Sequence, residues 1–219
     1  MSAQKRIMIV DDHPIFRKGL AQLINEEKDL RVTGEADDVF DARQALMQGR
    51  PDLLIVDITL KDASGLELIK YCTDRYPDLP VLVLSMHDES VYAERVIRAG
   101  ARGYIMKQEM TAHVIQAIRR VLAGDIYASE AVVTVLLGKM SGIQKHHDRN
   151  PVEELSDREF EIYTLIGKGF ERSEIARLLN LSVKTVGTYR EKIKDKLGLK
   201  SSAELMRSAI EWLREHSEE

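Results

Sequence analysis

The chain has 219 residues, of which 44% are hydrophobic and 31% are charged, a composition typical of a folded protein and not of a disordered one. Its 36 acidic and 32 basic residues give a net charge of −4, which excludes a globally basic nucleic-acid binder but allows a local basic patch. A single cysteine, Cys72, excludes an internal disulfide and favours a reducing compartment. Because no apolar run approaches the ~20 residues that span a bilayer and the first residues lack a signal-peptide core, we expect a cytoplasmic protein with no membrane partner.

Five short apolar segments alternate with longer helix-period segments in the first half of the chain. The short segments are Arg6–Val10, Leu30–Ala36, Leu53–Asp57, Val81–Ser85 and Gly103–Ile105. They are too short to be helices, and three of them are almost wholly apolar, which suits parallel strands covered on both faces. The expected helices begin near Pro14, Val39, Ser64, Glu89 and Thr111. Residues 1–125 are therefore predicted to form an α/β domain with a doubly wound, five-stranded parallel sheet and a functional crevice at the carboxyl ends of its strands.

Residues 126–151 are predicted to be a linker, with a helix over Ser129–Lys139. The stretch Gly138–Pro151 is polar and rich in turn-forming residues. The adjacent histidines His146 and His147 lack a ligand set, so a solvated linker is favoured over a metal site.

Residues 152–219 are predicted to form a small all-α domain of four helices. Ser156 with Glu159, and Ser201 with Glu204, have the spacing of capping boxes. Three glycines stand where helices are expected to end, namely Gly167, Gly169 and Gly198.

Charged and hydroxyl side chains follow the predicted strands of the first domain. They are Asp11 and Asp12 after the first strand, Asp57 at the end of the third, Ser85 at the end of the fourth and Lys107 after the fifth. Three carboxylates brought together repel one another, and Mg²⁺ would remove that repulsion. Such a site suits transfer of a phosphoryl group onto a carboxylate. Taken alone, Asp12 before Pro14 is better explained as a helix N-cap.

The segments IMIVDDHP, LLIVDITLKDASGLE, VLVLSMHDE and GARGYIMK resemble the four signature blocks of the bacterial response-regulator receiver domain, which has a flavodoxin-like fold. The resemblance covers roughly Lys5–Gly124. It implies that Asp57 accepts a phosphoryl group from a sensor histidine kinase. It also implies an Mg²⁺ site formed by Asp12 directly, Asp11 through water, Asp57, and the backbone carbonyl of Thr59.

The same resemblance assigns roles to three further residues. Lys107 would pair with the phosphoryl group, Ser85 would hydrogen-bond to it, and Tyr104 would be the switch aromatic that moves inward with Ser85. Without the family pattern, Tyr104 would be read as an ordinary core tyrosine. Two residues depart from the family: Lys61 replaces a common proline, and Met86 replaces a small residue, which would reduce access to the phosphoryl group.

Local positive charge points to a DNA-binding surface in the second domain. Ser182–Lys200 has six basic residues against two acidic ones, a local charge of +4. The apolar pattern predicts two short helices that meet at Asn180–Leu181, with Ser182 as the N-cap of the second, as in a helix-turn-helix. A small helical bundle with a solvated basic face is the alternative.

The segments LSDREFEIYTLIGKGF, SEIARLLNLSVKTVGTYREKIKDKLGL and SSAEL resemble the LuxR-type helix-turn-helix domain over about Leu155–Ile210. The whole chain therefore resembles a NarL/FixJ-type response regulator, with Ser182–Leu197 as recognition helix. The resemblance implies base contacts from Gly187, Thr188 and Glu191, and phosphate contacts from Lys184, Thr185, Arg190, Lys192 and Lys194. Departures are Gly187 where a long polar residue is frequent, Tyr189 for histidine, and Glu171 for a capping Ser or Thr.

The two resemblances together imply a transcription factor that is not an enzyme beyond its own phosphorylation and dephosphorylation. Phosphorylation of Asp57 would promote homodimerisation and release the helical domain for double-stranded promoter DNA, with RNA polymerase as a further candidate partner. Three alternatives remain: a small-molecule phosphatase that uses Asp57, a phosphorylation-independent binding module, and a helical domain that contacts protein instead of DNA.

Overall fold

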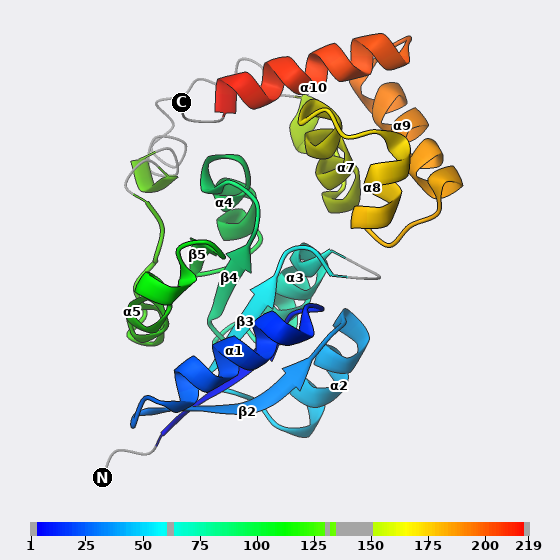
Figure 1. Cartoon of the computed structure of the whole chain (residues 1–219). Coiled ribbons are helices and arrows are strands. Elements are labelled where there is room, and N and C mark those ends of the chain that lie inside the picture. Colours follow the sequence, from blue (N-terminus) through cyan, green and yellow to red (C-terminus); the bar gives the residue numbers. More distant parts are fainter. Residues whose placement is uncertain (1–3, 61–63, 130–131, 135–150, 217–219) are drawn as a thin grey trace. The chain divides into compact units, whose positions relative to one another are not determined.

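The computed structural model describes residues 4–60, 64–129, 132–134 and 151–216. The chain divides into two compact units, Met1–Val135 and Leu136–Glu219 (Figure 1). Among the described residues, no helix is both long and apolar enough to cross a membrane.

A five-stranded parallel sheet forms the centre of the first unit. Its strands are β1 (Lys5–Val10), β2 (Leu30–Ala36), β3 (Leu53–Asp57), β4 (Val81–Ser85) and β5 (Gly103–Met106). They pair in the order β2-β1-β3-β4-β5, and every pairing is parallel. This confirms the predicted doubly wound sheet, whose strand order reverses beside β1. The carboxyl ends of β1 and β3 are neighbours, which is where such sheets hold their functional site.

Helices cover both faces of this sheet (Figure 1). They are α1 (Pro14–Asn25), α2 (Val39–Gln48), α3 (Gly65–Arg75), α4 (Glu89–Arg98) and α5 (Met110–Leu122). One core joins α1 and α5 to alternate strand residues such as Ile7, Ile55 and Leu84. The intervening strand residues point to the opposite face because side chains alternate along a strand.

The predicted N-cap role for Asp12 alone is wrong. The N-cap of α1 is His13, and its side chain makes no capping hydrogen bond. Pro14 at the first helical position already lacks an N–H group, so this helix start needs one capping bond fewer. Asp12 is therefore not used as a cap.

The segment after α5 lies along β5, the edge strand of the sheet. The N–H of Tyr127 donates to the Arg102 carbonyl at 2.9 Å, and the N–H of Tyr104 donates to the Tyr127 carbonyl at 2.8 Å. The N–H of Ser129 donates to the Glu89 carboxylate at 2.8 Å. Residues 126–129, predicted as the start of the linker, thus hydrogen-bond to β5 and α4.

The rest of the predicted linker is only partly described. Residues 132–134 are helical, and most of the predicted helix over Ser129–Lys139 lies outside the described residues, as do His146 and His147. The domain boundaries at residues 125 and 151 stay predictions.

The second unit contains four α-helices among its described residues, as predicted. They are α7 (Asp157–Gly167), α8 (Arg172–Leu178), α9 (Val183–Leu197) and α10 (Ser202–His216), and a short 3-10 helix, η1 (Pro151–Glu154), precedes them. A buried ion pair joins Arg158 to Glu161 at 2.7 Å, and Arg158 also donates to the Leu179 carbonyl at 2.8 Å. These contacts fix α7 against the end of α8.

Helix ends in the second unit follow the predicted local signals. Ser156 and Glu159 form a reciprocal capping box, and Ser182 caps α9 through the N–H of Thr185 at 3.0 Å. The N–H of Glu204 donates to Ser201 at 3.1 Å, but the Glu204 carboxylate accepts from the N–H of Lys200, one residue before the predicted partner. Gly198 ends α9 in the left-handed region, with φ of 67°.

Close approach of two backbones explains the glycine at the start of α3, and it generates a prediction. A Cβ at Gly65 would lie 2.0 Å from the Asp57 carbonyl oxygen, and the N–H of Gly65 donates to the Ile58 carbonyl at 2.7 Å. Gly65→Ala should therefore lower the free energy of unfolding by about 1–3 kcal/mol or more. Urea denaturation followed by circular dichroism measures this change.

Gly19→Ala is the matched control, because Gly19 lies within α1 and a Cβ there meets no atom within 4 Å. It should stabilise the protein by up to about 1 kcal/mol. Equal stability of the two variants would contradict the steric explanation.

Candidate phosphoacceptor site and DNA-binding surface

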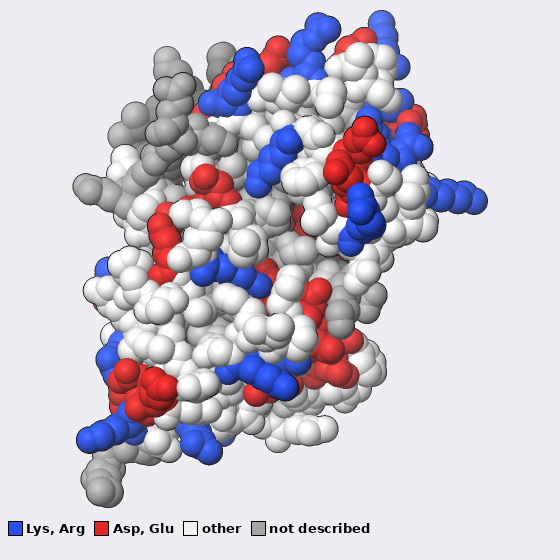
Figure 2. All heavy atoms as spheres, in the orientation of Figure 1, with Lys and Arg blue, Asp and Glu red and all other residues white. Residues whose placement is uncertain are grey.

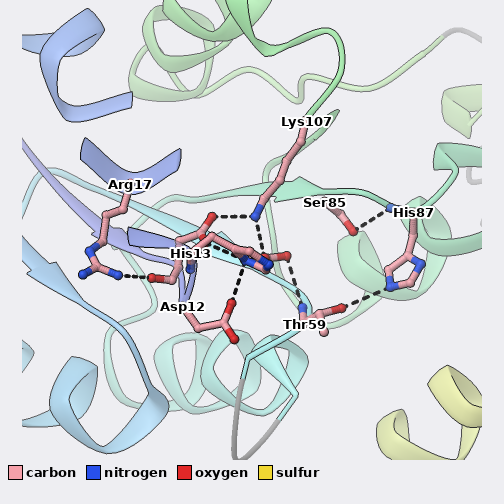
Figure 3. Close-up of polar contacts among 9 residues, drawn as sticks. Asp12, His13, Arg17, Thr59, Ser85, His87 and Lys107 are labelled. Carbon is pink, nitrogen blue, oxygen red and sulfur yellow. Dashed lines mark hydrogen bonds and ion pairs between the residues drawn. The ribbon is translucent and has the colours of Figure 1, made fainter. Parts of the chain in front are cut away.

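An ammonium group lies between two buried carboxylates at the carboxyl ends of β1 and β3 (Figure 3). Lys107 Nζ lies 2.6 Å from Asp11 Oδ2 and 2.6 Å from Asp57 Oδ2. All three side chains are less than 5% exposed. The Phe16 ring covers the ammonium, with its centroid 4.3 Å from Nζ. Residues from β1, β3 and the loop after β5 therefore meet in one buried polar cluster, as predicted.

Burial sets the ionisation of this cluster. It raises the pKa of Asp57 to about 7, although the Lys107 ammonium opposes this change. Burial also lowers the pKa of Lys107, but the carboxylates of Asp57 and Asp11 outweigh burial and raise that pKa above its ordinary value. Asp57 thus ionises at the cost of desolvation, while Lys107 stays charged beside it.

The acidic residues fit a hard divalent cation. Ligand atoms of Asp11, Asp12, His13 and Asp57 all lie within 4.8 Å of one another. Asp12 Oδ1 is buried and accepts no hydrogen bond, and a cation bound there would compete with the His13 ring, whose Nδ1 lies 2.8 Å away. Mg²⁺ takes carboxylates, carbonyls and waters as ligands. The N–H of Thr59 donates to Asp57 Oδ1 at 3.1 Å. This bond keeps the backbone of Thr59, whose carbonyl is a predicted Mg²⁺ ligand, close to the Asp57 carboxylate.

His13, the N-cap of α1, and Arg17, within α1, contact this site, although they were not singled out from the sequence. His13 Nδ1 lies 2.8 Å from Asp12 Oδ1, and the N–H of His13 donates to Asp11 Oδ1 at 2.8 Å. Arg17 donates to the backbone carbonyl of Asp11 (Figure 3). It also pairs with Glu35 at 3.2 Å. The helical spacing of four residues between His13 and Arg17 is the signal that could have found both.

The loop after β4 joins the predicted switch residues. Ser85 is fully buried, and its hydroxyl accepts from the N–H of His87 at 3.1 Å. The Tyr104 hydroxyl donates to the His87 carbonyl at 2.8 Å, and the His87 ring lies 3.1 Å from Thr59 Oγ1. Tyr104 is 2% exposed, and burial raises the pKa of its hydroxyl, which stays a donor. His87, which sequence reasoning missed, thus contacts three predicted site residues.

Of the two receiver residues that depart from the family pattern, the structure describes one. Met86 is 61% exposed beside buried Ser85, so its side chain projects away from the sheet. Lys61 lies outside the described residues.

The α9 surface of the second unit carries the predicted DNA contacts. Figure 2 shows lysine and arginine side chains, interspersed with acidic ones, over the part of the surface that α8 and α9 occupy. A shallow groove of about 260 Å³ is lined by Lys184, Thr185, Thr188, Tyr189 and Lys192. The predicted phosphate and base contacts therefore divide between this groove and the neighbouring face of α9.

Several charged residues of α9 contact protein groups. Lys194 pairs with Glu191 at 2.8 Å, and its side chain is 14% exposed against 63% for Glu191. Lys196 pairs with Glu159 of α7 at 2.7 Å. The base contact predicted for Glu191 therefore competes with an ion pair within α9.

Comparison with known proteins identifies both units. Residues 7–119 match the response regulator receiver domain, and residues 153–209 match the luxR family of bacterial regulatory proteins. The chain belongs to the DNA-binding two-component response regulators with a LuxR-type helix-turn-helix domain.

Relatives resemble the chain over nearly its whole length. The oxygen regulatory protein NreC of Staphylococcus carnosus (strain TM300) is 37% identical over 94% of this chain and 96% of its own. NreC of Staphylococcus aureus (strain JH9) is 36% identical with the same coverage.

Solved structures of the same family also match. RcsB from Salmonella enterica serovar Typhimurium, bound to promoter rprA with the phosphomimetic BeF3−, gives a TM-score of 0.60 at 26% identity, covering 94% of this chain and 98% of that one. A LuxR-family two-component response regulator from Aurantimonas sp. SI85-9A1 gives 0.57 at 32% identity, covering 64% of this chain and 99% of that one.

The raised pKa of Asp57 predicts a pH-dependent stability difference. Between the ordinary carboxyl pKa near ~4 and about 7, the unfolded chain ionises Asp57 while the folded chain keeps it protonated, so stability falls as pH rises. Asp57→Asn removes this loss. Its stability gain over the unsubstituted chain should grow by about 1.4 kcal/mol per pH unit across this interval and level off above it. Urea denaturation with a chelator present measures the gain.

Added Mg²⁺ should reduce the stability gain of Asp57→Asn over the unsubstituted chain, because a cation stabilises the ionised Asp57 carboxylate. A gain that does not change with pH would contradict the assignment of the shift to Asp57.

Proposed function

We propose that Mg²⁺-dependent phosphorylation of Asp57 promotes dimerisation of this response regulator and releases its helix-turn-helix domain for promoter binding. The observation that carries the proposal is the buried contact of Lys107 with both Asp57 and Asp11 at 2.6 Å. An isolated structural ion pair needs one carboxylate, whereas phosphoryl transfer needs an acceptor, a cation site and a positive charge beside them.

The transfer step follows from the arrangement around Asp57. One Asp57 oxygen forms a bond to phosphorus while the bond from phosphorus to the donor breaks and its electron pair leaves with the donor. Asp11, Asp12, Asp57 and the Thr59 carbonyl would hold Mg²⁺, which supplies charge neutralisation for the phosphoryl oxygens when bound. Lys107 then exchanges its carboxylate partner for a phosphoryl oxygen, and the Thr59 N–H orients the acceptor.

The bonds of the β4–α4 loop support a route from the acceptor to the rest of the receiver. Ser85 and Tyr104 both bond to the backbone of His87, so a Ser85 hydroxyl that turns toward the phosphoryl group releases the His87 N–H. Tyr104 must then adjust with the loop. The backbone N–H of Tyr104 donates to the Tyr127 carbonyl, so the first residues after α5 contact β5, the strand that contains Tyr104.

Promoter DNA as partner follows from the family and from α9. The solved RcsB structures include a promoter complex with BeF3− and two RcsB dimers bound to parallel DNAs. For this chain we propose a homodimer whose two α9 helices enter the major groove of half-sites one turn apart, ~34–36 Å. The predicted contacts from Lys184, Thr185 and Lys192 line one groove of α9. Base contacts from Gly187, Thr188 and Glu191 remain proposals.

The remaining partners follow from the class of protein. A sensor histidine kinase would supply the phosphoryl group in the cytoplasm, and RNA polymerase would read out promoter occupancy. Candidate dimerisation surfaces are α1 with α5, or α10, on which Met206 is 43% exposed.

Removal of the acceptor should uncouple the chain from its phosphoryl donor. In the presence of Mg²⁺ and acetyl phosphate, the unsubstituted chain should shift toward a dimer in sedimentation and enrich a two-fold symmetric site from a random duplex library. Asp57→Asn should lose both responses, because asparagine cannot form the acyl phosphate. Chelation of Mg²⁺ should abolish the same responses in the unsubstituted chain.

Asp74→Asn is the matched control, since Asp74 is an exposed aspartate on α3, and it should respond like the unsubstituted chain. A full donor response in Asp57→Asn would refute phosphorylation gating. Enrichment of the same site without donor would leave DNA binding intact and remove only the gate.

The phosphatase alternative makes a different prediction. A regulator should hydrolyse its own acyl phosphate but should not turn over a chromogenic phosphate ester at steady state. Release of nitrophenol from p-nitrophenyl phosphate measures this activity. Turnover that depends on both Mg²⁺ and Asp57 would favour the enzyme.

A further inference from the structure

A side chain from α8 lies over the position in α9 where Gly187 has none. A Cβ built at Gly187 would lie 3.5 Å from Arg172 Nη1, 3.7 Å from its Cζ and 4.0 Å from its Nε. Three atoms of one guanidinium at such similar distances mean that the planar group lies across the glycine. Arg172 is the first residue of α8. An arginine of the first helix of the motif therefore occupies the space of the missing side chain on the recognition helix.

A second arginine lies beside the first. Arg190, one turn after Gly187 on α9, has a buried Nε with no hydrogen-bond partner. Arg190 stands three residues after Gly187 and therefore on the same face of α9, the face that the Arg172 guanidinium covers. Burial and the charge of Arg172 lower the pKa of Arg190. Two like charges at short range with a buried, unpaired donor are unfavourable unless an anion binds between them.

Protein carboxylates do not supply that anion. In the part of the chain that the structure describes, neither Arg172 nor Arg190 forms an ion pair with an acidic residue. Glu191 is the acidic residue whose charge acts on Arg190, but its carboxylate pairs with Lys194 at 2.8 Å. The positive charge of the two guanidinium groups is therefore available to a ligand.

We infer that Arg172 and Arg190 together bind a phosphate group of the DNA backbone, and that Arg172 supplies a side-chain contact at the position where Gly187 has no side chain. This inference rests on the proposed DNA binding by α9. A backbone phosphate fits better than a base edge, because the first helix of a helix-turn-helix crosses the DNA backbone while the second enters the groove. Guanidinium groups also match phosphate oxygens with two parallel hydrogen bonds.

This arrangement gives Gly187 a function. A glycine within a helix lowers stability relative to alanine. At this position it leaves the surface of α9 flat, so that the Arg172 guanidinium can lie across it. A long side chain at position 187 would displace that group.

The salt dependence of DNA binding tests the inference, because each phosphate contact releases counterions. The full chain, with Mg²⁺ and BeF3−, is titrated against a labelled duplex of about 24 base pairs, enough for two half-sites, at roughly 50–200 mM KCl. Arg172→Ala and Arg190→Ala should each lower the slope of log affinity against log salt by about 0.9 for each half-site, hence by about 1.8 for the dimer, and weaken binding at least about five- to tenfold. Arg177→Ala, which removes an exposed arginine from the last turn of α8, should keep the slope.

Substitutions at Gly187 test the geometry. Gly187→Ala should keep the slope, since its Cβ makes only ordinary contact with Arg172. Gly187→Leu should lower the slope as much as Arg172→Ala does, and Arg172→Ala should have no further effect in the Gly187→Leu background. Circular dichroism confirms that each variant keeps its helices.

The outcomes separate this inference from the proposed function. An unchanged slope in Arg172→Ala, or an equal loss in Arg177→Ala, would overturn the phosphate site while DNA binding stands. DNA affinity that is the same with and without BeF3− would overturn phosphorylation gating alone. The salt dependence of Arg172→Ala would still test the phosphate site in that case. A chain that binds no duplex in either state would overturn both.

Discussion

The Lys107 ammonium between Asp11 and Asp57 is the interaction on which the receiver unit depends. It joins the carboxyl ends of β1 and β3 to the loop after β5 and keeps two acidic side chains together under less than 5% exposure. Such a cluster is stable only while each charge has a partner. The carboxylates have further partners: the Thr59 N–H donates to Asp57 Oδ1 and the His13 N–H donates to Asp11 Oδ1. The raised pKa of Asp57 shows that these contacts offset its desolvation only in part, which leaves the acceptor ready to gain from a cation or a change of partner.

Much of this fold could be predicted from the sequence because its strands are short apolar runs of one kind. Strands β2, β3 and β4 begin and end where the pattern placed them, and the parallel order brings Asp11, Asp57 and Lys107 together by topology alone. What could not be predicted depends on loop geometry. His87 contacts Thr59 across the site, although 28 residues separate them, and no periodic pattern reports such a contact. The N-cap interpretation of Asp12 failed for a related reason, since the proline that suggested a helix start also removed one need for a cap.

In the helical unit, local and tertiary preferences conflict at one residue. The sequence marks Gly187 as a departure from the family, because a long polar residue is frequent at this position. The structure shows the Arg172 guanidinium at the position of the missing side chain, and no sequence pattern predicts this contact, because Arg172 lies fifteen positions away on another helix. Positions at which a sequence breaks a local rule are often those where a functional demand overrides it. Asn180, in the left-handed region with φ of 53° at the turn between α8 and α9, follows the local rule instead, since asparagine tolerates that conformation.

The hydrogen bonds that Tyr127 makes to Arg102 and Tyr104 also affect how much of the sheet edge is open to other chains. β5 is an edge strand, and an edge with free N–H and C=O groups is a template for strand addition by another molecule. The chain covers part of that edge with its own backbone just after α5. A receiver fragment that ended before Ile126 would lose this cover and expose β5 to sheet-to-sheet aggregation, whereas one that continued through Ser129 would keep it. The first residues after the last receiver helix therefore protect solubility as well as connecting the two units.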